Sequence, residues 1–220
     1  MNNILILAPH PDDETLGCGG TLLKEKKMGS KIHWVIGTSM YEKNGWDKKL
    51  ISKRNKEIDI VQKKYNFDST HFLELPTTLV DEASFPEIIK KIEKIFKKIK
   101  PKIVFIPFYK DIHTDHQILS KAAVSCTKWF RFPSIKKILY YETLSETHWS
   151  QSDSFFNPNV YVDISKFINK KIEIMKIYKS EIKQSPFPRS EKNIKAKAIF
   201  NGSMSGYSYA EAFQLLLERD

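Results

Sequence analysis

The stretch Asn3-Ile-Leu-Ile-Leu-Ala-Pro-His-Pro-Asp-Asp-Glu14 gives the clearest indication of the fold of this 220-residue chain. Residues 3–8 form a short, continuous apolar run, which is typical of a strand buried on both faces of a parallel sheet. A loop at 9–13 comes next, and a helix-length stretch from Glu14 to Met28 follows, with Gly29 placed to end the helix. This strand–loop–helix unit predicts an α/β protein.

The same alternation of strand-length and helix-length runs continues along the chain. Further strands are expected at 31–39, 70–75, 102–107, 137–143 and, as a short sixth strand, 159–163. Helices are expected at 47–64, 84–100 and 115–129, with two or three more in the C-terminal third. The alternation predicts a Rossmann-like, mostly parallel sheet with helices on both faces, in one domain that spans residues 1–220. The polar, proline-containing stretches 145–158 and 184–190 are predicted to be loops.

Composition limits the class of protein. Apolar residues make up 41% of the chain, which fits a globular protein and argues against disorder. No run approaches the ~20 apolar residues of a membrane span, and the first apolar stretch lacks the basic region of a signal peptide. The two cysteines, Cys18 and Cys126, fit a reducing compartment. We therefore expect a cytoplasmic protein without a stable membrane span.

The net charge of +10 raises the question of an anionic partner. Most of the positive residues are lysines scattered along predicted helix faces, and no nucleic-acid motif accompanies them, so no nucleic-acid partner is predicted. A basic field still favours an anionic substrate, such as one that carries phosphate or a nucleotide. A bidentate anion clamp would have to come from the four arginines, which are Arg54, Arg131, Arg189 and Arg219.

Two of the predicted loops carry unusual polar side chains where a strand ends. His10-Pro-Asp-Asp-Glu14 follows the first strand, and His113-Thr-Asp-His116 follows the strand at 102–107. These loops hold half of the six histidines of the chain, together with four carboxylates. Open α/β sheets bind ligands outside the carboxyl ends of their strands, so we expect these side chains to meet at one edge of the sheet.

The residue types in these loops are those that bind a catalytic zinc ion. His10 and Asp13 lie three residues apart at the first turn, and His116 can complete the set from the second. We therefore expect a zinc site, or a site for another divalent transition metal such as iron or cobalt. A metal ion held in this way activates water as a nucleophile.

The other polar residues of the two loops are candidates for proton transfer and for charge stabilisation, which a reaction of metal-activated water also needs. Asp12 lies beside the ligands and is the candidate general base, and His113 can polarise a carbonyl or stabilise an oxyanion. Glu14 and Asp115 can orient ligand imidazoles or cap their helices. For either loop alone, an equal alternative to a metal site is that the acidic residues only stabilise a helix N-terminus and that the histidines are structural. Because the two loops follow strand ends at matched positions, we favour the metal site. The other histidines, which are His33, His71 and His148, have no partner motif and are expected to be structural.

These motifs resemble a known family. Ala8-Pro-His-Pro-Asp-Asp-Glu-Thr-Leu-Gly-Cys-Gly-Gly20 is similar to the signature of the PIG-L/LmbE-like N-deacetylases. His113-Thr-Asp-His116 resembles the second family motif, His-Pro-Asp-His, with threonine in place of proline. Three other stretches are also similar to the family: Arg54-Asn-Lys-Glu57, Lys176-Ile-Tyr-Lys-Ser-Glu181 and Gly206-Tyr-Ser-Tyr-Ala-Glu-Ala-Phe213. The second of them resembles a family helix, with glutamate where glutamine is usual.

The resemblance implies a substrate class that the residues alone do not give. It implies a zinc-dependent hydrolase that removes acetate from N-acetylglucosamine units joined to inositol, malate, lipid-linked inositol or other aglycones. It also implies that His10, Asp13 and His116 are the zinc ligands. By the same resemblance, Asp12 is the general base and His113 stabilises the tetrahedral intermediate.

Two arginines are the candidate substrate-binding residues. Arg54 matches an arginine that contacts the substrate in several members of the family, although a helix salt bridge with Glu57 or Asp59 is an equal alternative. Arg189 lies in the loop at 184–190, where it can bind phosphate or carboxylate or cap the next helix. Aromatic residues on predicted loops can stack on a sugar face, and they are Tyr41, Trp46, Phe108, Tyr109 and Trp149.

Two other classes of function remain open at this point. A zinc hydrolase of a non-sugar amide or an ester would have the same site, so only a panel of substrates separates it from a sugar deacetylase. A non-catalytic binding module would be expected to have lost the base or a ligand. In this chain all five candidate residues are present: His10, Asp12, Asp13, His113 and His116. The sequence is also compatible with an oligomer.

Overall fold

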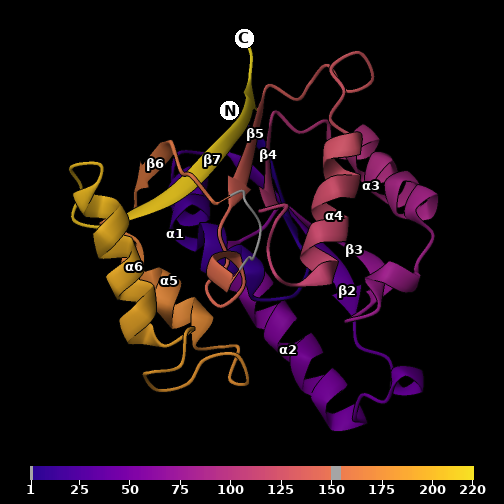
Figure 1. The fold of residues 1–220 in the computed structure, drawn as a ribbon, viewed down its shortest axis with the longest axis horizontal. Helices are drawn as coiled ribbons and strands as arrows, with labels where there is room; N and C mark the ends of the chain where they lie inside the picture. The colour runs from indigo at the N-terminus through magenta and orange to yellow at the C-terminus, as the bar shows by residue number, and fades with distance from the viewer. Residues whose placement is uncertain (1, 150–154) are drawn as a thin grey trace.

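The centre of the molecule is one seven-stranded sheet, seen in a computed structural model that describes residues 2–149 and 155–220 (Figure 1). Its strands are β1 (Asn3–Ala8), β2 (Lys31–Ser39), β3 (Ser69–Pro76), β4 (Ile103–Pro107), β5 (Lys137–Tyr141), β6 (Val160–Asp163) and β7 (Ala210–Glu218). They lie in the order β3-β2-β1-β4-β5-β7-β6. Only β7 runs antiparallel to its neighbours, β5 and β6. The predicted α/β fold is confirmed, with a mixed sheet.

Helices cover both faces of the sheet. They are α1 (Asp13–Lys27), α2 (Lys48–Tyr65), α3 (Phe85–Ile99), α4 (Thr114–Ser125), α5 (Ile168–Met175) and α6 (Glu191–Ser203). Helices α1, α2, α5 and α6 enclose one hydrophobic core, and α3 and α4 enclose the other (Figure 1). Alternate residues of β1 contribute to the two cores, with Ile4 and Ile6 in the first and Leu5 and Leu7 in the second. None of the helices in the described ranges is long and apolar enough to cross a membrane.

The C-terminal third differs from the sequence prediction. It contains two helices, as expected, but residues 210–218 form the strand β7, which was not predicted. Its sequence, Ala-Glu-Ala-Phe-Gln-Leu-Leu-Leu-Glu, is rich in helix-forming residues. The strand nevertheless fills a slot between two others, so that Phe213 pairs with Tyr141 of β5 and with Val160 of β6. Pairing on both sides outweighs the intrinsic propensity of the segment.

Two predicted helices are shorter than expected. The helix predicted to reach residue 129 ends at Ser125, where the Thr127 hydroxyl donates a hydrogen bond to the Val124 carbonyl at 2.7 Å. The segment 176–181, which resembles a family helix, consists of turns because α5 ends at Met175. Of the predicted loop at 145–158, residues 150–154 lie outside the described residues.

The topology fixes where a ligand site should lie. From β1 the chain passes through α1 to β2 on one side, whereas from β4 it passes through α4 to β5 on the other. The carboxyl ends of β1 and β4 are therefore the switch point of the sheet, where α/β proteins have a crevice. The loops that carry His10 and His113 both begin at these ends.

Glycines in α1 allow this helix to lie close to the sheet. A Cβ at Gly17 would lie 2.2 Å from Cδ2 of the buried Tyr141 side chain, so that even alanine would not fit. Further along the helix, the backbone N–H of Gly20 donates to the buried Glu211 carboxylate at 2.8 Å. Lys171 donates to the same carboxylate at 2.7 Å. These contacts hold α1 against β5, β7 and α5, and they fix its N-terminus at the switch point.

Candidate metal centre and active site

A cavity of about 550 Å³ opens at the switch point. Its lining comes from the loop after β1, the end of β2 and the segment after it, α2, β3, the segments after β3, β4 and β5, and the segment between α5 and α6. The structure brings together all of the residues predicted for metal binding, catalysis and substrate binding, because each of them lines this cavity: His10, Asp12, Asp13, Arg54, His113, His116 and Arg189. Of the predicted site residues, Glu14 and Asp115 lie behind the lining.

Three ligand-type atoms converge in the floor of the cavity. Asp13 Oδ2 lies 3.5 Å from His10 Nδ1 and 3.3 Å from His116 Nε2, and the two nitrogens lie 3.3 Å apart. A tetrahedral zinc ion with bonds of about 2.0–2.1 Å requires separations of about 3.3–3.4 Å between its ligand atoms. The triangle matches this requirement, and its edges are longer than good hydrogen bonds. The donor set and its spacing therefore fit a divalent transition metal.

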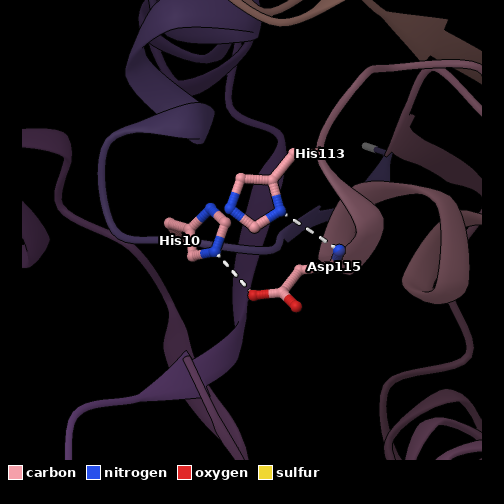
Figure 2. Close-up of side chains that lie close together, drawn as sticks. All are labelled: His10, His113 and Asp115. Atoms are coloured by element: carbon pink, nitrogen blue, oxygen red, sulfur yellow. Dashed lines mark hydrogen bonds and ion pairs between the residues drawn. The ribbon is translucent and has the colours of Figure 1, made fainter. Parts of the chain in front are cut away.

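Buried carboxylates hold the opposite nitrogens of the two imidazole rings. His10 Nε2 lies 3.0 Å from Asp115 Oδ2, as the dashed line in Figure 2 shows, and His116 Nδ1 lies 2.8 Å from Asp111 Oδ2. Both carboxylates are fully buried. A carboxylate that accepts one ring N–H leaves the lone pair of the other nitrogen directed at the metal. Asp115 was predicted for such a role, whereas Asp111 was not predicted.

A second group of ligand-type residues shares His10, and it consists of His10, His113 and Asp115 (Figure 2). In this group the Asp115 carboxylate already accepts the backbone N–H of Thr78 at 2.8 Å and that of Val80 at 3.3 Å. His113 Nδ1 already accepts the backbone N–H of Asp115 at 3.1 Å. Both oxygens of Asp115 are thus engaged, and Oδ2 also lies 3.0 Å from His10 Nε2, whereas only Oδ2 of Asp13 accepts a backbone N–H, so the triangle of His10, Asp13 and His116 is the better metal site.

The side chains of the metal triangle stabilise the charged forms of one another. Burial alone would lower the pKa of His10, but the carboxylates of Asp115 and Asp13 raise it to about 9. The pKa of His116 is likewise raised, against burial, by Asp13 and Asp111. Burial alone would raise the pKa of Asp13, but the two imidazoles lower it well below its ordinary value. Asp13 is therefore ionised and directed at the point where a cation would bind.

Asp12 is held in an unusual conformation beside the metal triangle. Its φ is 140° and its ψ is −27°, which is a rare combination for a residue other than glycine and is typical of functional sites. The carboxylate accepts a hydrogen bond from Arg189 Nη1 at 2.9 Å, and the backbone N–H donates to the Glu14 carboxylate at 3.0 Å. Burial and the Asp13 charge raise the pKa of Asp12 well above its ordinary value, whereas Arg189 opposes this shift.

Glu14 contacts neither imidazole, so it does not orient a ligand ring, which was one of the two roles expected for it. Its side chain is fully buried behind the loop, where it accepts hydrogen bonds from the hydroxyls of Thr15 at 2.6 Å and Tyr178 at 2.9 Å. The reason is its position in the first turn of α1, which directs it into the core instead of the cavity. Through the backbone of Asp12, it supports the strained turn.

His113 presents an N–H to the cavity. Burial, together with the positive charges of His10 and His116, lowers the pKa of His113, so the ring is neutral near pH 7. Its Nδ1 accepts the backbone N–H of Asp115, which places the proton of the neutral ring on Nε2. In Figure 2 this second nitrogen lies on the side of the ring away from Asp115. The neutral ring can therefore donate a hydrogen bond.

Each guanidinium nitrogen of Arg54 lies against a protein group. Nη1 donates to the Pro11 carbonyl at 2.7 Å, Nη2 donates to Ser180 and Glu181, and Nε lies 3.4 Å from Glu57. The side chain is buried, although its edge lines the cavity. Arg54 thus ties α2 and the turn at 176–181 to the His10 loop, and the alternative of a salt bridge with Glu57 is present.

Arg189 and Glu181 line the cavity beside Asp12. Arg189 Nη1 lies 2.9 Å from Asp12 Oδ2 and 3.1 Å from Glu181 Oε2. The Glu181 carboxylate therefore lies between the two arginines, and their positive charges lower its pKa despite burial. Sequence reasoning did not predict Glu181 as a site residue, because its partner Arg54 lies 127 residues away in the chain.

The candidate sugar-stacking aromatics divide into two groups. Tyr41 and Trp46 line the cavity. Phe108 and Tyr109 instead pack in or against the second hydrophobic core, because the chain turns inward directly after β4. Trp149 is 65% exposed and does not line the cavity. Phe72 of β3, which was not singled out in the sequence, joins Tyr41 and Trp46 in the lining.

Comparison with known proteins identifies the family. A family model described as PIG-L: GlcNAc-PI de-N-acetylase matches residues 5–127, which is more than half of the chain. The chain belongs to the PIG-L family. The matched residues contain both motif loops, so every residue of the metal triangle lies within the PIG-L match.

Relatives of this PIG-L chain include a diacetylchitobiose deacetylase from Thermococcus kodakarensis. The two are 26% identical over 98% of this chain and 84% of the relative. A solved structure of a conserved protein, TT1542 from Thermus thermophilus, is also 26% identical, with a TM-score of 0.78 over 100% of this chain and 97% of that chain. The similarity therefore extends through the C-terminal third.

The fold is shared with an enzyme of another class. The structure of GalB from Pseudomonas putida KT2440, a 4-carboxy-2-hydroxymuconate hydratase, has a TM-score of 0.75 and covers 100% of this chain and 98% of that chain. The two are only 15% identical, so the likeness concerns the fold alone. The reaction of a PIG-L protein must therefore be argued from the site.

Proposed function

We propose that this PIG-L protein is a metal-dependent hydrolase that removes the acetyl group from an N-acetylated amino sugar, of the N-acetylglucosaminyl type. The observation that carries the proposal is the triangle of His10, Asp13 and His116, with Asp12 and His113 in the lining of the same cavity. The family description and the related diacetylchitobiose deacetylase support the sugar amide as the substrate class.

Zinc is the metal that the donor set suits best. Two imidazoles and one carboxylate at these separations leave one tetrahedral position open, which is typical of catalytic zinc sites. When bound, the ion supplies a Lewis acid that lowers the pKa of water and polarises a carbonyl oxygen. The same ligands also accept iron or cobalt. Asp115 and Asp111 fix the orientation of the two rings.

Asp12 is the general base in this proposal. Its carboxylate lies beside Asp13 and faces the cavity, where it can take a proton from the attacking water. Its raised pKa brings the carboxylate closer to the range of a base that works near neutral pH. Arg189 holds one carboxylate oxygen at 2.9 Å, so that the other oxygen is left for the proton transfer.

His113 stabilises the negative charge that develops on the acetyl oxygen. As a neutral ring with its proton on Nε2, it donates a hydrogen bond into the cavity without adding a second cation beside the metal. The proton that Asp12 has taken can then pass to the departing sugar nitrogen. The products are acetate and a free amine.

Arg54 is assigned a positioning role, because its nitrogens already bind protein groups. Replacement of Arg54 by alanine is expected to lower the free energy of unfolding by about 3 kcal/mol, since it leaves Glu57 and Glu181 without their buried partner. Urea unfolding monitored by circular dichroism measures this change. The matched control is Lys53→Ala, which removes a 45% exposed neighbour that lies 4.0 Å from the same Glu57 and should cost less than ~1 kcal/mol. An Arg54 variant that keeps full stability but loses substrate affinity would instead show a substrate contact.

The experiment that tests the proposed function is acetate release across a panel of compounds. The panel contains N-acetylated amino sugars and their glycosides, simple non-sugar acetamides, and acetate esters. We expect acetate and a free amine from the N-acetylglucosaminyl compounds, and much slower release from the other two classes. Release only from esters or non-sugar amides would replace the sugar assignment with a broader metal-hydrolase activity. Absence of release from all three classes would overturn the proposal.

A further inference from the structure

Glu181 joins the two arginines that line the cavity. Its Oε1 accepts hydrogen bonds from Arg54 Nη2 and from the Ser180 hydroxyl, the latter at 2.9 Å. Its Oε2 lies 3.1 Å from Arg189 Nη1. Burial alone would raise the pKa of Glu181, but the positive charges of Arg54 and Arg189 lower it, so the carboxylate is ionised near pH 7. The two oxygens of Glu181 therefore hold different partners.

The Oε1 side of Glu181 is firmly anchored. Arg54 is buried, its Nη1 donates to the Pro11 carbonyl at 2.7 Å, and its Nε lies 3.4 Å from Glu57 Oε2. Its Nη2 also donates to the Ser180 hydroxyl at 3.0 Å. A planar guanidinium with partners at all three nitrogens cannot turn without losing several of them. Arg54 and Ser180 thus fix the place of the Glu181 carboxylate.

Arg189 is held less completely than Arg54. Among the described residues, it reaches both Asp12, at 2.9 Å, and Glu181, at 3.1 Å, through the same Nη1. Its Nε is buried without a hydrogen-bond partner, and its Cζ lies 5.6 Å from the centre of the Phe187 ring. A guanidinium has five N–H donors, so one that is held at a single nitrogen can turn and present another N–H. Without Glu181, only Asp12 and the Phe187 ring would keep Arg189 in this orientation.

Asp12 depends on its neighbours for its position. A backbone with φ 140° and ψ −27° persists at a residue other than glycine only where the surrounding structure holds it. Glu14 accepts the backbone N–H of Asp12, and Arg189 donates to the carboxylate oxygen Oδ2. Arg189 is therefore the contact that sets the direction of the carboxylate, and this direction decides whether Oδ1 can reach the attacking water.

We propose that Glu181 is a positioning residue for the general base and acts on Asp12 through Arg189. Glu181 fixes the guanidinium, and the guanidinium holds Oδ2 of Asp12 so that Oδ1 is free for the proton transfer. Glu181 has no hydrogen bond or ion pair with the metal triangle among the described residues, so its effect on the reaction is indirect. This inference rests on the proposed function, in which Asp12 takes a proton from water.

Glu181→Gln tests this role with little change of shape. Glutamine has one acceptor oxygen, so it cannot accept from Arg54 and from Arg189 through separate oxygens. We expect the kcat for acetate release from an N-acetylglucosaminide to fall by roughly tenfold or more, with KM within about twofold and an unchanged zinc content. An unchanged kcat would overturn the inference, as would a loss of rate that appears only in KM or that comes with loss of zinc.

A double-mutant cycle tests whether the effect passes through Arg189. Arg189→Met removes the guanidinium and should lower kcat at least as much as Glu181→Gln. In the Arg189→Met background, Glu181→Gln should cost less than about twofold or restore part of the rate, because it then neutralises a carboxylate that has lost its partner beside Asp12. Equal losses in the two backgrounds would contradict action through Arg189.

The matched control is Glu191→Gln. This carboxylate in the first turn of α6 pairs with Lys176 at 2.6 Å and does not line the metal cavity. It should leave kcat unchanged, because it removes a glutamate charge from the same region of the chain without touching either arginine of the cavity. A fall in kcat equal to that of Glu181→Gln would show that the loss does not come from the contact with Arg189, and the inference would fail.

The orientation of Arg189 is measured without catalysis. The chain has only four arginines, so NMR of ¹⁵N-labelled protein gives few guanidinium signals, and Arg189→Met assigns those of Arg189. We expect separate Nη resonances for Arg189 in the unaltered protein, because two carboxylates slow the rotation about its Cζ–Nε bond, and merged resonances in Glu181→Gln. Fast rotation in the unaltered protein, or slow rotation that survives the substitution, would overturn the inference. Neither result depends on whether the protein releases acetate.

Discussion

Replacement of Asp12 by asparagine is expected to lower the kcat for acetate release by roughly 10²–10⁴-fold. The amide oxygen of asparagine can still accept the hydrogen bond from Arg189, so the shape of the site is kept. The amide cannot take a proton from water, and this is the function that the proposal assigns to Asp12. The measurement is steady-state acetate release, together with metal analysis of the same sample.

Metal content separates a lost base from a damaged site. Because Asp12 is outside the triangle of ligand atoms, the asparagine variant should bind as much metal as the unaltered protein. The matched control is Asp59→Asn, an exposed carboxylate on α2, which should leave kcat unchanged. Full activity of the Asp12 variant would remove this residue as the base. Loss of metal from that variant would show that Asp12 contributes to the metal site itself.

Replacement of His116 by alanine is expected to abolish stoichiometric metal binding and, with it, acetate release. His116 Nε2 is one corner of the triangle, at 3.3 Å from both Asp13 Oδ2 and His10 Nδ1, and alanine leaves only two protein ligands. Competition with a coloured zinc chelator gives the affinity of each variant. The control is His71→Ala, which removes an imidazole that lies on β3 outside the cavity.

Asp111 provides a graded comparison for the same measurement. Asp111→Asn should weaken metal binding by about 10–100-fold, because it removes the carboxylate that orients His116 but leaves all three ligands. The expected order of zinc affinity is therefore the unaltered protein, the Asp111 variant, and the His116 variant. If the His116 variant bound zinc as tightly as the Asp111 variant, His116 would not be a ligand.

The first strand and the residues after it carried most of the sequence prediction. A continuous apolar run followed by His10-Pro-Asp-Asp13 predicts a buried parallel strand that ends in polar groups, and β1 has this form. The rule that ligands bind at the carboxyl ends of strands then placed His116 beside this loop, although it is 106 residues from His10. Local pattern and topology together predicted that these two loops meet, and both of them line the cavity.

The parts that escaped prediction depend on contacts distant in the chain. Asp111 carried no motif of its own, and its pairing with His116 follows from the path of the loop after β4. Glu181 is paired with Arg54 across 127 residues, and no period in the sequence indicates that contact. The strand β7 was missed because its residues favour a helix until β5 and β6 offer hydrogen bonds on both sides.

The net charge of +10 says little about the charge of the cavity. Most lysines lie on outer faces of helices, whereas Glu74 of β3 and two loop residues, Glu146 and Glu181, line the cavity. A sum over the sequence cannot distinguish these two environments. The local charge of the lining is therefore known only from the structure and not from the total of +10.

Titration of metal-free protein with zinc, followed by acetate release from an N-acetylglucosaminide, tests metal-dependent sugar deacetylation most directly. We predict no release without metal, a linear rise as zinc is added, and a plateau at about one zinc ion per chain. The full rate in metal-free protein, or no release at any zinc concentration, would contradict the proposed reaction.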